Sequence, residues 1–393
     1  MRILFVADGR SPIAGNWLRH WIERGDEVHL VTTFPGERLP GLHSFTLLPV
    51  AFGGMGAGGT ARPAAPAFGL RQRLRGMLRP LRYWIGPLSL PYYQRRFASL
   101  VEGINPDLVH ALRIPFEGML AEATPAGVPL LVSVWGNDLT LHAQGSPFMK
   151  AWTRRTLGRA QALIADAERD LRLGQAGGFS GPTLVVPGGG GIHLDEIQAS
   201  RTRPQALPEA IPVGAALVVN PRGSRPGSLR NDSFFQAIPQ VLERFPQAFF
   251  ICPGMAGDAD SERWVAGLGL AERTKLWPRL SQPQLWTLFH RSQVYVSPSL
   301  HDGTPNSLLE AMACGCFPVL GDVESMREWI TTGVNGRLVD ARRPQALAEA
   351  MIAALSDSDF RQRAAQENAR LIASRAEYGR CMAQADALYQ KMT

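Results

Sequence analysis

Two carboxylates flank the expected start of a helix near residue 305. Asp302 precedes a glycine, and Glu310 follows eight positions later. Thr304 is a suitable helix cap and Pro305 suits the first turn, so Glu310 would lie about 7–8 Å further along the axis at ~1.5 Å per residue. The first N–H groups of a helix lack partners within it and can bind a phosphate. A ligand with a diphosphate and hydroxyl groups on both sides, such as a nucleotide sugar, suits this arrangement. The N–H groups concerned are those of Asn306, Ser307 and Leu308.

The longer string around these acids is ordered and specific. Residues 302–319 read D-G-T-P-N-S-L-L-E-A-M-A-C-G-C-F-P-V. This string resembles the donor-binding signature of family 4 glycosyltransferases, which have the GT-B fold and carry a first acid, seven further residues and then a Glu. The resemblance implies that Asp302 contacts the donor sugar and Glu310 the ribose, although Glu is usual where Asp302 stands. The alternative is an ordinary capped helix with solvated acids. The other expected donor-binding residues are Gly303, Thr304, Pro305, Asn306, Ser307 and Leu308.

A basic loop at residues 220–231 follows the first expected strand of the second half. A diphosphate calls for cations as well as helix N–H groups. Family members place an Arg and a Lys in this loop, both on the diphosphate. Arg222 matches the Arg, while the Lys has no match, and Arg225 or Arg230 is the candidate to replace it. The alternative for each is a solvated basic turn.

Loops of the first half carry further candidates. His110 ends an expected strand and is either a hydrogen-bonded core histidine or a polar group near the reacting sugar. Residues 133–138 read S-V-W-G-N-D where family members often have T-x-H-G-x-D, so Trp135 replaces the histidine and Asp138 keeps the acid. Trp135 would stack on a sugar or base, or pack in the core. We predict catalytic roles for Asp302, Asp138 and His110. The expected acceptor-side or loop residues are Gly9, Arg10, Ser11 and Trp135.

Both halves alternate short apolar strands with helices, which favours parallel sheets covered by helices. In such sheets ligands bind at the carboxyl ends of the strands. We predict an α/β protein with two Rossmann-like domains whose parallel sheets face each other across a cleft, the GT-B plan. Helices are expected over 16–24, 116–123, 232–244 and 359–392. Strands are expected over 2–7, 27–33, 108–111, 129–135, 162–165 and 183–186, and over 216–220, 248–252, 294–297, 317–320 and 337–339.

The domain boundary is expected in a proline-rich stretch. Residues 1–198 would form the acceptor-side domain, 199–212 the linker, and 213–375 the donor-binding domain. The resemblance implies that a C-terminal helix at about 376–393 packs back on the first domain.

The composition favours a globular protein, and the residue spacing suggests no metal site. The chain has 393 residues, of which 45% are hydrophobic and 19% charged. The apolar run at the N-terminus is too short for a signal peptide, and no run reaches the ~18 residues of a membrane span, so a cytoplasmic location is expected. Asp258 and Asp260 form a D-x-D pattern, but capping of a following helix explains them. No cluster has zinc spacing, and the four cysteines are expected to be buried thiols. We expect no cofactor.

A basic segment suggests a further partner. No Asp or Glu occurs between Arg38 and Glu102, whereas eight arginines do, so this +8 exceeds the formal +7 of the whole chain. The arginines of Arg62–Arg96 alternate with Leu, Trp and Tyr, which suits the surface of an anionic membrane. A basic loop on a soluble enzyme is the alternative, and no nucleic-acid fold signal accompanies the segment, so nucleic acid is not an expected partner.

The expected function is a retaining, metal-independent glycosyltransferase of the hexosyltransferase type. It would move a sugar from a nucleotide-diphosphate sugar to a glycan or lipid-linked acceptor of the cell envelope, at the inner membrane face. Alternatives are a GT-B epimerase or phosphorylase, and a catalytically silent nucleotide-sugar or glycan-binding protein. The sequence does not identify the sugar, the base or the acceptor.

Overall fold

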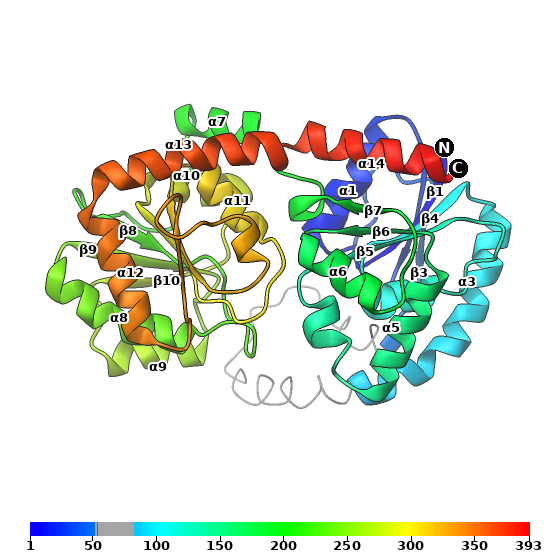
Figure 1. Ribbon diagram of the computed structural model, residues 1–393, viewed down its shortest axis with the longest axis horizontal. Coiled ribbons are helices and arrows are strands. Elements are labelled where there is room, and N and C mark those ends of the chain that lie inside the picture. Colours follow the sequence, from blue (N-terminus) through cyan, green and yellow to red (C-terminus); the bar gives the residue numbers. More distant parts are fainter. Residues whose placement is uncertain (52, 54–81) are drawn as a thin grey trace. The chain divides into compact units, whose positions relative to one another are not determined.

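The protein contains two α/β units, each built around its own parallel sheet. The computed structural model describes residues 1–51, 53 and 82–393 (Figure 1). By its contacts the chain divides into Met1–Gly190 with Cys381–Thr393, which we name unit 1, and Gly191–Arg380, which we name unit 2. The two sheets confirm the expected α/β fold with two Rossmann-like domains.

Unit 1 contains a seven-stranded sheet in the order β3-β2-β1-β4-β5-β6-β7. The chain order reverses at β1, because β2 and β3 lie on one side of it and β4 with the later strands on the other. Such a reversal opens a crevice at the carboxyl ends of the central strands, where ligands bind. The strands are β1 (Arg2–Ala7), β2 (Glu27–Thr32), β3 (Ser44–Leu47), β4 (Leu108–Ala111), β5 (Leu130–Val134), β6 (Ala162–Ala165) and β7 (Thr183–Val185).

Helices cover both faces of this sheet. On one face Leu4 and Val6 of β1 belong to an apolar cluster with Phe97 of α3. The intervening residue, Phe5, points to the opposite face, where its ring lies 5.8 Å from that of His110. The helices and helical turns are α1 (Pro12–Glu23), η2 (Gly86–Ser89), α3 (Leu90–Ile104), η3 (Ile114–Gly118), α4 (Met119–Ala121), η4 (Asp138–His142), α5 (Pro147–Arg159), α6 (Glu168–Ala176) and η5 (Pro187–Gly189).

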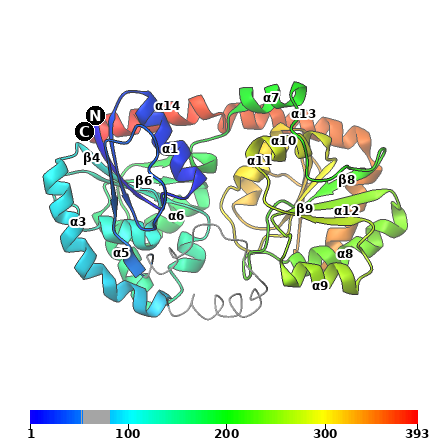
Figure 2. The same ribbon diagram turned by 180° about the vertical axis from the view of Figure 1, so that it is seen from behind.

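The C-terminal helix α14 (Tyr378–Met392) packs beside α1, as both views show (Figures 1 and 2). Its anchor is the fully buried Tyr389. The Tyr389 hydroxyl accepts a hydrogen bond from the indole N–H of Trp17 at 3.0 Å and is also hydrogen-bonded to Nδ1 of His110. Its ring stacks on that of Trp21 with centroids 4.0 Å apart. The end of the chain is therefore part of the core of unit 1.

Unit 2 contains a six-stranded parallel sheet in the order β10-β9-β8-β11-β12-β13, with the reversal at β8. Helices α7, α10 and α11 lie on one side of the sheet and α8 and α12 on the other (Figure 1). The apolar side chains of each set belong to a separate cluster. The strands are β8 (Ala216–Val219), β9 (Ala248–Pro253), β10 (Thr274–Trp277), β11 (Val294–Ser297), β12 (Phe317–Gly321) and β13 (Arg337–Val339). The helices are α7 (Leu194–Thr202), α8 (Asn231–Arg244), α9 (Ala259–Gly267), α10 (Gln282–Arg291), α11 (Asn306–Ala313), η6 (Met326–Glu328), α12 (Pro344–Ser356) and α13 (Ser358–Arg375).

Some helical predictions were wrong, and the backbone explains why. The helix expected over 116–123 is reduced to the short α4, because Phe116 has a φ of +68° and breaks the helical path. The helix expected over 359–392 is two helices, α13 and α14, since Ala376 between them leaves the helical conformation. Helix α1 starts four residues earlier than predicted.

The strand predictions were closer. Every expected strand is present with ends within two residues of the prediction, and only the edge strands β3 and β10 were not predicted. The N-terminal segment of unit 1 ends at Gly190, eight residues before the expected boundary at residue 198. Helix α7 covers the start of the expected linker 199–212.

Tyr389 provides a test of the α14 anchor. We expect Tyr389→Phe to lower the free energy of unfolding by about 1–3 kcal/mol, because the buried polar groups of Trp17 and His110 lose their partner. The measurement is the midpoint of urea unfolding. Tyr92→Phe is the matched control, since the Tyr92 side chain is 62% exposed. Equal shifts in the two variants would contradict the anchoring role.

Candidate active site

Two loops meet at the carboxyl ends of β8 and β11, the central strands of the unit 2 sheet. Arg222 follows β8, and Asp302 follows β11. The loops are joined by backbone hydrogen bonds, among them that from the N–H of Arg230 to the carbonyl of Pro298 at 2.9 Å. The site therefore lies where the strand order reverses, as expected for a ligand site of this sheet type.

Arg222 and Asp302 form a buried ion pair. Nη2 of Arg222 donates to Oδ2 of Asp302, and the side chains are only 6% and 13% exposed. Nη1 of Arg222 donates to the hydroxyl of Ser307 on α11 at 3.3 Å, and this hydroxyl is also 3.0 Å from that of Tyr295. Burial opposes the charge on Arg222, but the carboxylate of Asp302 outweighs it and the pKa of Arg222 is raised. The first predicted acid and the first predicted arginine are thus in direct contact.

Further donors orient the carboxylate of Asp302. The hydroxyl of Ser299 donates to Oδ2 at 3.2 Å, and the N–H of Gly303 donates to Oδ1 at 3.1 Å. The backbone carbonyl of Asp302 accepts from the hydroxyl of Ser325 at 2.8 Å. A group bound by Asp302 must therefore lie beside Arg222 as well.

Helix α11 begins at Asn306, so the predicted Thr304 cap was wrong. Pro305 precedes the helix with an extended backbone, and no side chain caps the helix at this position. The hydroxyl of Thr304 instead accepts from the indole N–H of Trp329 at 3.1 Å. Its role is to fasten the loop to the η6 region.

The start of α11 keeps two of the three predicted N–H groups available. The N–H of Leu308 donates to the carbonyl of Pro305 at 2.9 Å. Within residues 1–51, 53 and 82–393, no protein partner is recorded for the N–H groups of Asn306 and Ser307. These two amides and the positive end of the helix dipole suit an anion.

Among the remaining loop arginines, Arg225 shares the neighbourhood of Arg222. Arg225 is exposed, and the positive charge of Arg222 is the largest cause that lowers its pKa to about 10. Arg279 acts in the same direction. Arg230 instead donates to Asp232 at 2.7 and 2.8 Å. A bound anion would relieve the repulsion between Arg222 and Arg225.

Glu310 is a buried carboxyl group on α11. Its side chain is 4% exposed, and Nε2 of Gln282 donates to Oε1 at 2.7 Å. Burial raises the pKa of Glu310 to about 7, against the opposing effects of Gln282 and Trp286. The carboxylate has lone pairs left for further donors such as hydroxyl groups.

His110 lies inside the core of unit 1. It is fully buried, and Nε2 lies 2.8 Å from the hydroxyl of Ser133, while Nδ1 is occupied by Tyr389. Burial lowers the pKa of His110 to about 3, so the ring is neutral. This environment corresponds to the core-histidine alternative, and it does not support direct contact with a substrate.

Asp138 is fully buried and holds the strand-end loops together. Nη2 of Arg113 donates to its Oδ1 at 2.6 Å, and the N–H groups of Ile114 and Trp135 each donate to Oδ2 at 3.2 Å. Burial opposes the charge of Arg113, but the carboxylates of Asp138 and Glu117 favour it and the pKa of Arg113 is raised. Trp135 itself is half-buried. Contact of Asp138 or Trp135 with a substrate stays a prediction.

The predicted residues of the loop after β1 form hydrogen bonds and an ion pair with neighbouring protein groups. The N–H of Gly9 donates to Oγ1 of Thr32 at 3.0 Å. Arg10 pairs with Asp8 at 2.9 Å, and the hydroxyl of Ser11 caps α1.

A pocket of about 230 Å³ lies next to this loop in unit 1. It opens at the carboxyl ends of β1, β2 and β4, so it sits at the reversal of this sheet. Asp8, which follows β1, and Arg113, which follows β4, both line it. The other lining residues are Phe34, Arg82, Tyr83, Pro115, Phe116, Glu117 and His142.

Sequence reasoning missed several of these groups. Gln282 and Arg279 lie outside every motif. Only the fold of unit 2 places Gln282 beside Glu310 and Arg279 near Arg225. Arg82 lay within the basic segment, but nothing in its spacing separated it from the other arginines. Glu117 is one of two acids in an expected helix, and its burial could not be read from the sequence.

The described residues offer no metal site. Asp258 caps α9 by accepting from the N–H of Ser261 at 3.1 Å, while Asp260 pairs with Arg263 at 2.7 Å. Across the part of the chain that the structure describes, no three His, Cys, Asp or Glu side chains are grouped to hold a metal ion.

Both units match known family models. Residues 9–189 match the model described as glycosyl transferase 4-like domain, and residues 230–371 match glycosyl transferases group 1. The GDP-mannose:cellobiosyl-diphosphopolyprenol alpha-mannosyltransferase of Xanthomonas campestris is 28% identical over 268 residues, which are 65% of this chain and 67% of that protein. The phosphatidyl-myo-inositol mannosyltransferase of Mycobacterium tuberculosis is 31% identical over 132 residues, or 32% of this chain and 34% of that protein.

Solved structures share the fold over the whole chain. Sucrose-phosphate synthase from Thermosynechococcus elongatus aligns with a TM-score of 0.72 and 14% identity, covering 100% of this chain and 99% of that chain. Anabaena HepE in complex with UDP aligns with a TM-score of 0.70 and 17% identity, covering 100% of both chains. The GT-B fold expected from the sequence is thereby confirmed.

Glu310 makes stability depend on pH. Burial raises its pKa from 4.5 to about 7 in the folded state only, so wild-type stability falls as pH rises from about 4.5 to about 7 and the loss persists above. Glu310→Gln removes this charge. The free energy of unfolding of the variant minus that of the wild type should therefore be about 2 kcal/mol greater at pH 8 than at pH 5. Urea unfolding at both pH values measures it.

The matched control for this titration is Glu243→Gln, because Glu243 is exposed on α8. Its difference from wild type should not change with pH. A pH-independent difference for Glu310→Gln as well would show that the carboxyl group ionises freely in the folded protein.

Proposed function

The chain is a glycosyltransferase that combines a glycosyl transferase 4-like domain with a glycosyl transferases group 1 domain, and from that premise we propose its reaction. It moves a hexosyl group from a nucleotide-diphosphate sugar to a lipid-linked or glycan acceptor of the cell envelope, with retention of configuration and without a metal. The observation that carries this proposal is the cluster of Arg222, Asp302 and the α11 start at the reversal of the unit 2 sheet.

Each part of this cluster suits one part of the donor. Arg222, Arg225 and the amides of Asn306 and Ser307 bind the diphosphate, and their charge stabilises it as it leaves. Asp302 accepts from hydroxyl groups of the sugar while it orients Arg222. Glu310 lies further along α11, where it accepts from the ribose hydroxyls.

Retention follows in this proposal from attack on the face that the diphosphate leaves. The acceptor hydroxyl forms the new bond to the anomeric carbon as the bond to the diphosphate breaks, and its proton passes to the departing diphosphate. No described carboxylate is assigned as a nucleophile, because Asp302 is engaged by Arg222 and Asp138 by Arg113. We therefore propose no covalent intermediate.

The relatives suggest which donors to try first. The Xanthomonas campestris relative is named for GDP-mannose and for a diphosphopolyprenol-linked acceptor, and the Anabaena fold neighbour was solved with UDP and with UDP-glucose. GDP-mannose and UDP-glucose are accordingly the first pair, with a cellobiosyl lipid diphosphate as acceptor. Release of nucleoside diphosphate that requires the acceptor, together with an α-linked product in proton NMR, is the expected result.

The alternatives give different results in the same assay. A silent binding protein would bind the donor without releasing nucleoside diphosphate. A phosphorylase would require inorganic phosphate, and an epimerase would change the donor without any acceptor. Product of inverted configuration would overturn the proposed retention.

An exposed apolar patch supports action at a membrane surface. The patch consists of four exposed side chains: Trp84 (51%), Leu88 (66%), Tyr92 (62%) and Phe148 (44%). The ring centroids of Trp84 and Phe148 lie 6.0 Å apart in an edge-to-face arrangement. Exposed basic residues flank the patch on α3 and α5, which carry Arg95, Arg96, Lys150 and Arg154. Aromatic and basic side chains together suit the interface of an anionic bilayer.

The basic segment itself is only partly described. Arg82, Arg95 and Arg96 belong to the described residues, whereas Arg62, Arg71, Arg73, Arg75 and Arg79 lie outside them. In the described ranges no helix has the length and apolarity to cross a membrane. We propose peripheral binding to the inner membrane face through the Trp84–Phe148 patch.

The diphosphate role of Arg225 is tested by removing its charge. We expect Arg225→Gln to weaken nucleoside diphosphate binding about tenfold, since a charge-assisted hydrogen bond is worth ~1.5–3 kcal/mol. Arg230→Gln should have a smaller effect because Asp232 engages that guanidinium. Arg244→Gln, at an exposed position near the end of α8, is the control in calorimetry. A larger loss with Arg230→Gln would reverse the assignment.

Vesicle flotation tests the membrane proposal. Replacing Trp84 and Phe148 with Ser should reduce recovery with anionic vesicles at both low and high salt, because the lost contribution is apolar. The wild type should bind more weakly at high salt, since screening weakens the contribution of the arginines. Val334→Ser is the control, as Val334 is 53% exposed in unit 2. Absence of the wild type from anionic vesicles at low salt would end the proposal.

A further inference from the structure

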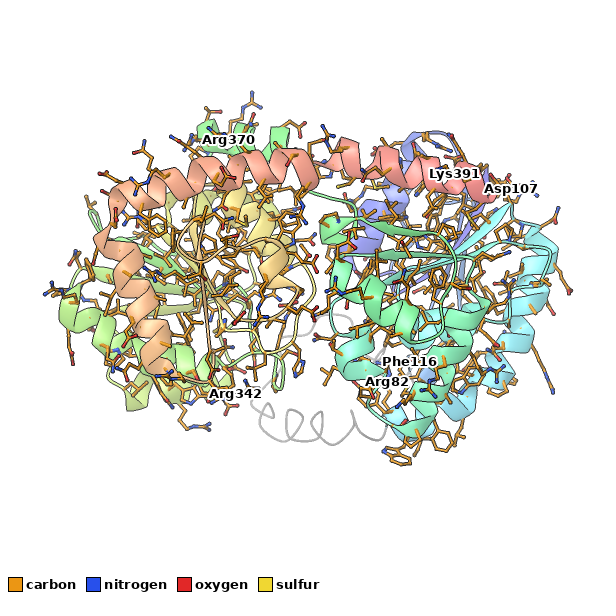
Figure 3. The ribbon with its side chains drawn as sticks, in the orientation of Figure 1. Arg82, Asp107, Phe116, Arg342, Arg370 and Lys391 are labelled. Atoms are coloured by element: carbon orange, nitrogen blue, oxygen red, sulfur yellow. The ribbon has the colours of Figure 1, made fainter. Side chains whose placement is uncertain are left out.

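The pocket of unit 1 contains a guanidinium that forms no ion pair with any described acidic group. Arg82 lies between two aromatic rings, with its Cζ 5.1 Å from the centroid of Phe34 and 4.5 Å from that of Phe116. Arg82 and Phe116 are labelled beside one another in Figure 3. Within the described part of the chain, no ion pair involves Arg82, and its buried Nε has no hydrogen-bond partner. Stacking holds the guanidinium in place while leaving its donors unused.

The acids that line this pocket are already engaged. Asp8 is paired with Arg10 at 2.9 Å. Glu117 is buried and accepts from the hydroxyl of Thr33, and burial raises its pKa, which favours the neutral form. Neither carboxylate forms an ion pair with Arg82 among the described residues, although both act to raise the pKa of Arg82.

A second cation lines the same pocket. Arg113 uses Nη2 on Asp138, and its buried Nε has no partner among the described residues. Burial is the largest cause that lowers the pKa of Arg82. The charge of Glu117 opposes it, and the positive charge of Arg113 lowers the pKa further. Two guanidinium groups close enough to repel each other favour an anion between them.

The backbone around the pocket is strained in a way that supports this arrangement. Phe116 has φ +68° and ψ −46°, a conformation that a bulky side chain rarely adopts. Its ring faces Arg82, and a Cβ on Gly86 would come within 3.1 Å of that ring. Strain of this kind persists where packing fixes a residue at a ligand site.

We propose that this pocket binds an anionic group of the acceptor, a phosphate or carboxylate attached to its sugar, through Arg82 and Arg113. The inference rests on the proposed function, because it names the class of acceptor for the transfer. The pocket volume of about 230 Å³ is below the ~300–1,000 Å³ of sites that enclose a drug-sized ligand. It suits the charged end of an acceptor, while the rest of the molecule extends outside.

Calorimetry on the full chain with four small probes tests this inference. Octyl glucoside is the neutral probe, and glucosyl octyl phosphate, glucose 1-phosphate and octyl glucuronide are the anionic probes. A saturating nucleoside diphosphate, GDP or UDP according to which one binds, blocks the donor site of unit 2. We expect at least one anionic probe to bind tenfold more tightly than octyl glucoside. The tightest of the three identifies a lipid-linked phosphate, a free sugar phosphate or a carboxylate as the source.

Substitution of Arg82 locates the binding. Arg82→Gln should abolish the preference for the anionic probe while leaving octyl glucoside binding unchanged. Arg95→Gln is the matched control, because Arg95 is an exposed arginine of α3 that does not line the pocket. Equal binding of neutral and anionic probes by the wild type, or an unchanged preference in Arg82→Gln, would overturn the inference.

Two further measurements keep the test decisive. If Arg82→Gln does not fold, Arg82→Lys keeps the charge but not the planar stacking, and it should reduce the preference in part. Inorganic phosphate should compete with the anionic probe on the wild type, and failure to compete would count against the pocket. Donor binding is recorded on the same samples, so absence of donor binding refutes the proposed function, whereas normal donor binding without anion preference refutes this inference alone.

Discussion

The reversal of strand order in each sheet is the constraint on which the chemistry of this protein depends. The strands on both sides of each reversal are buried beyond their first residues, so their side chains are not exposed to a ligand. Polar side chains can be presented only where the strands end, and parallel pairing brings these ends to one edge. Asp8 and Arg113 meet in this way after β1 and β4, and Arg222 and Asp302 after β8 and β11. The two units thus apply one topological rule to two different groups of residues.

Charge pairing then determines which of these groups remain available. A buried charge is costly unless it has a partner, and removal of one partner leaves the other uncompensated. Asp138 fixes Arg113, and Asp302 fixes Arg222, so each edge has one arginine with a defined orientation. A further arginine lies near each pair without an ion pair of its own among the described residues, Arg82 in unit 1 and Arg225 in unit 2. The ordered pair positions the site, and the additional cation provides its attraction for anions.

The sequence predicted the fold well because short buried strands are local patterns. The strands β1, β4 and β6 have the predicted ends, and the signature at 302–319 located the unit 2 site. Contacts between distant residues could not be predicted in this way. Arg222 and Asp302 are 80 residues apart, and His110 and Tyr389 are 279 apart, so only the tertiary structure shows that one histidine is a core residue. The start of α11 and the break at Phe116 were missed because neighbouring packing overrides local preference.

The unfavourable features of this protein are concentrated where ligands are expected. Glu310 is a buried acid with a raised pKa, Arg82 is a cation stacked on aromatic rings with no ion pair among the described residues, and Phe116 has a strained backbone. The clusters behind both sheets, in contrast, are apolar and well packed. A stable core allows such costs at a site, and real proteins break local rules mainly where function requires it. A donor bound in unit 2 would satisfy Glu310, and an anion bound in unit 1 would satisfy Arg82, so the groups that cost stability in the free protein are those that gain most from the substrates.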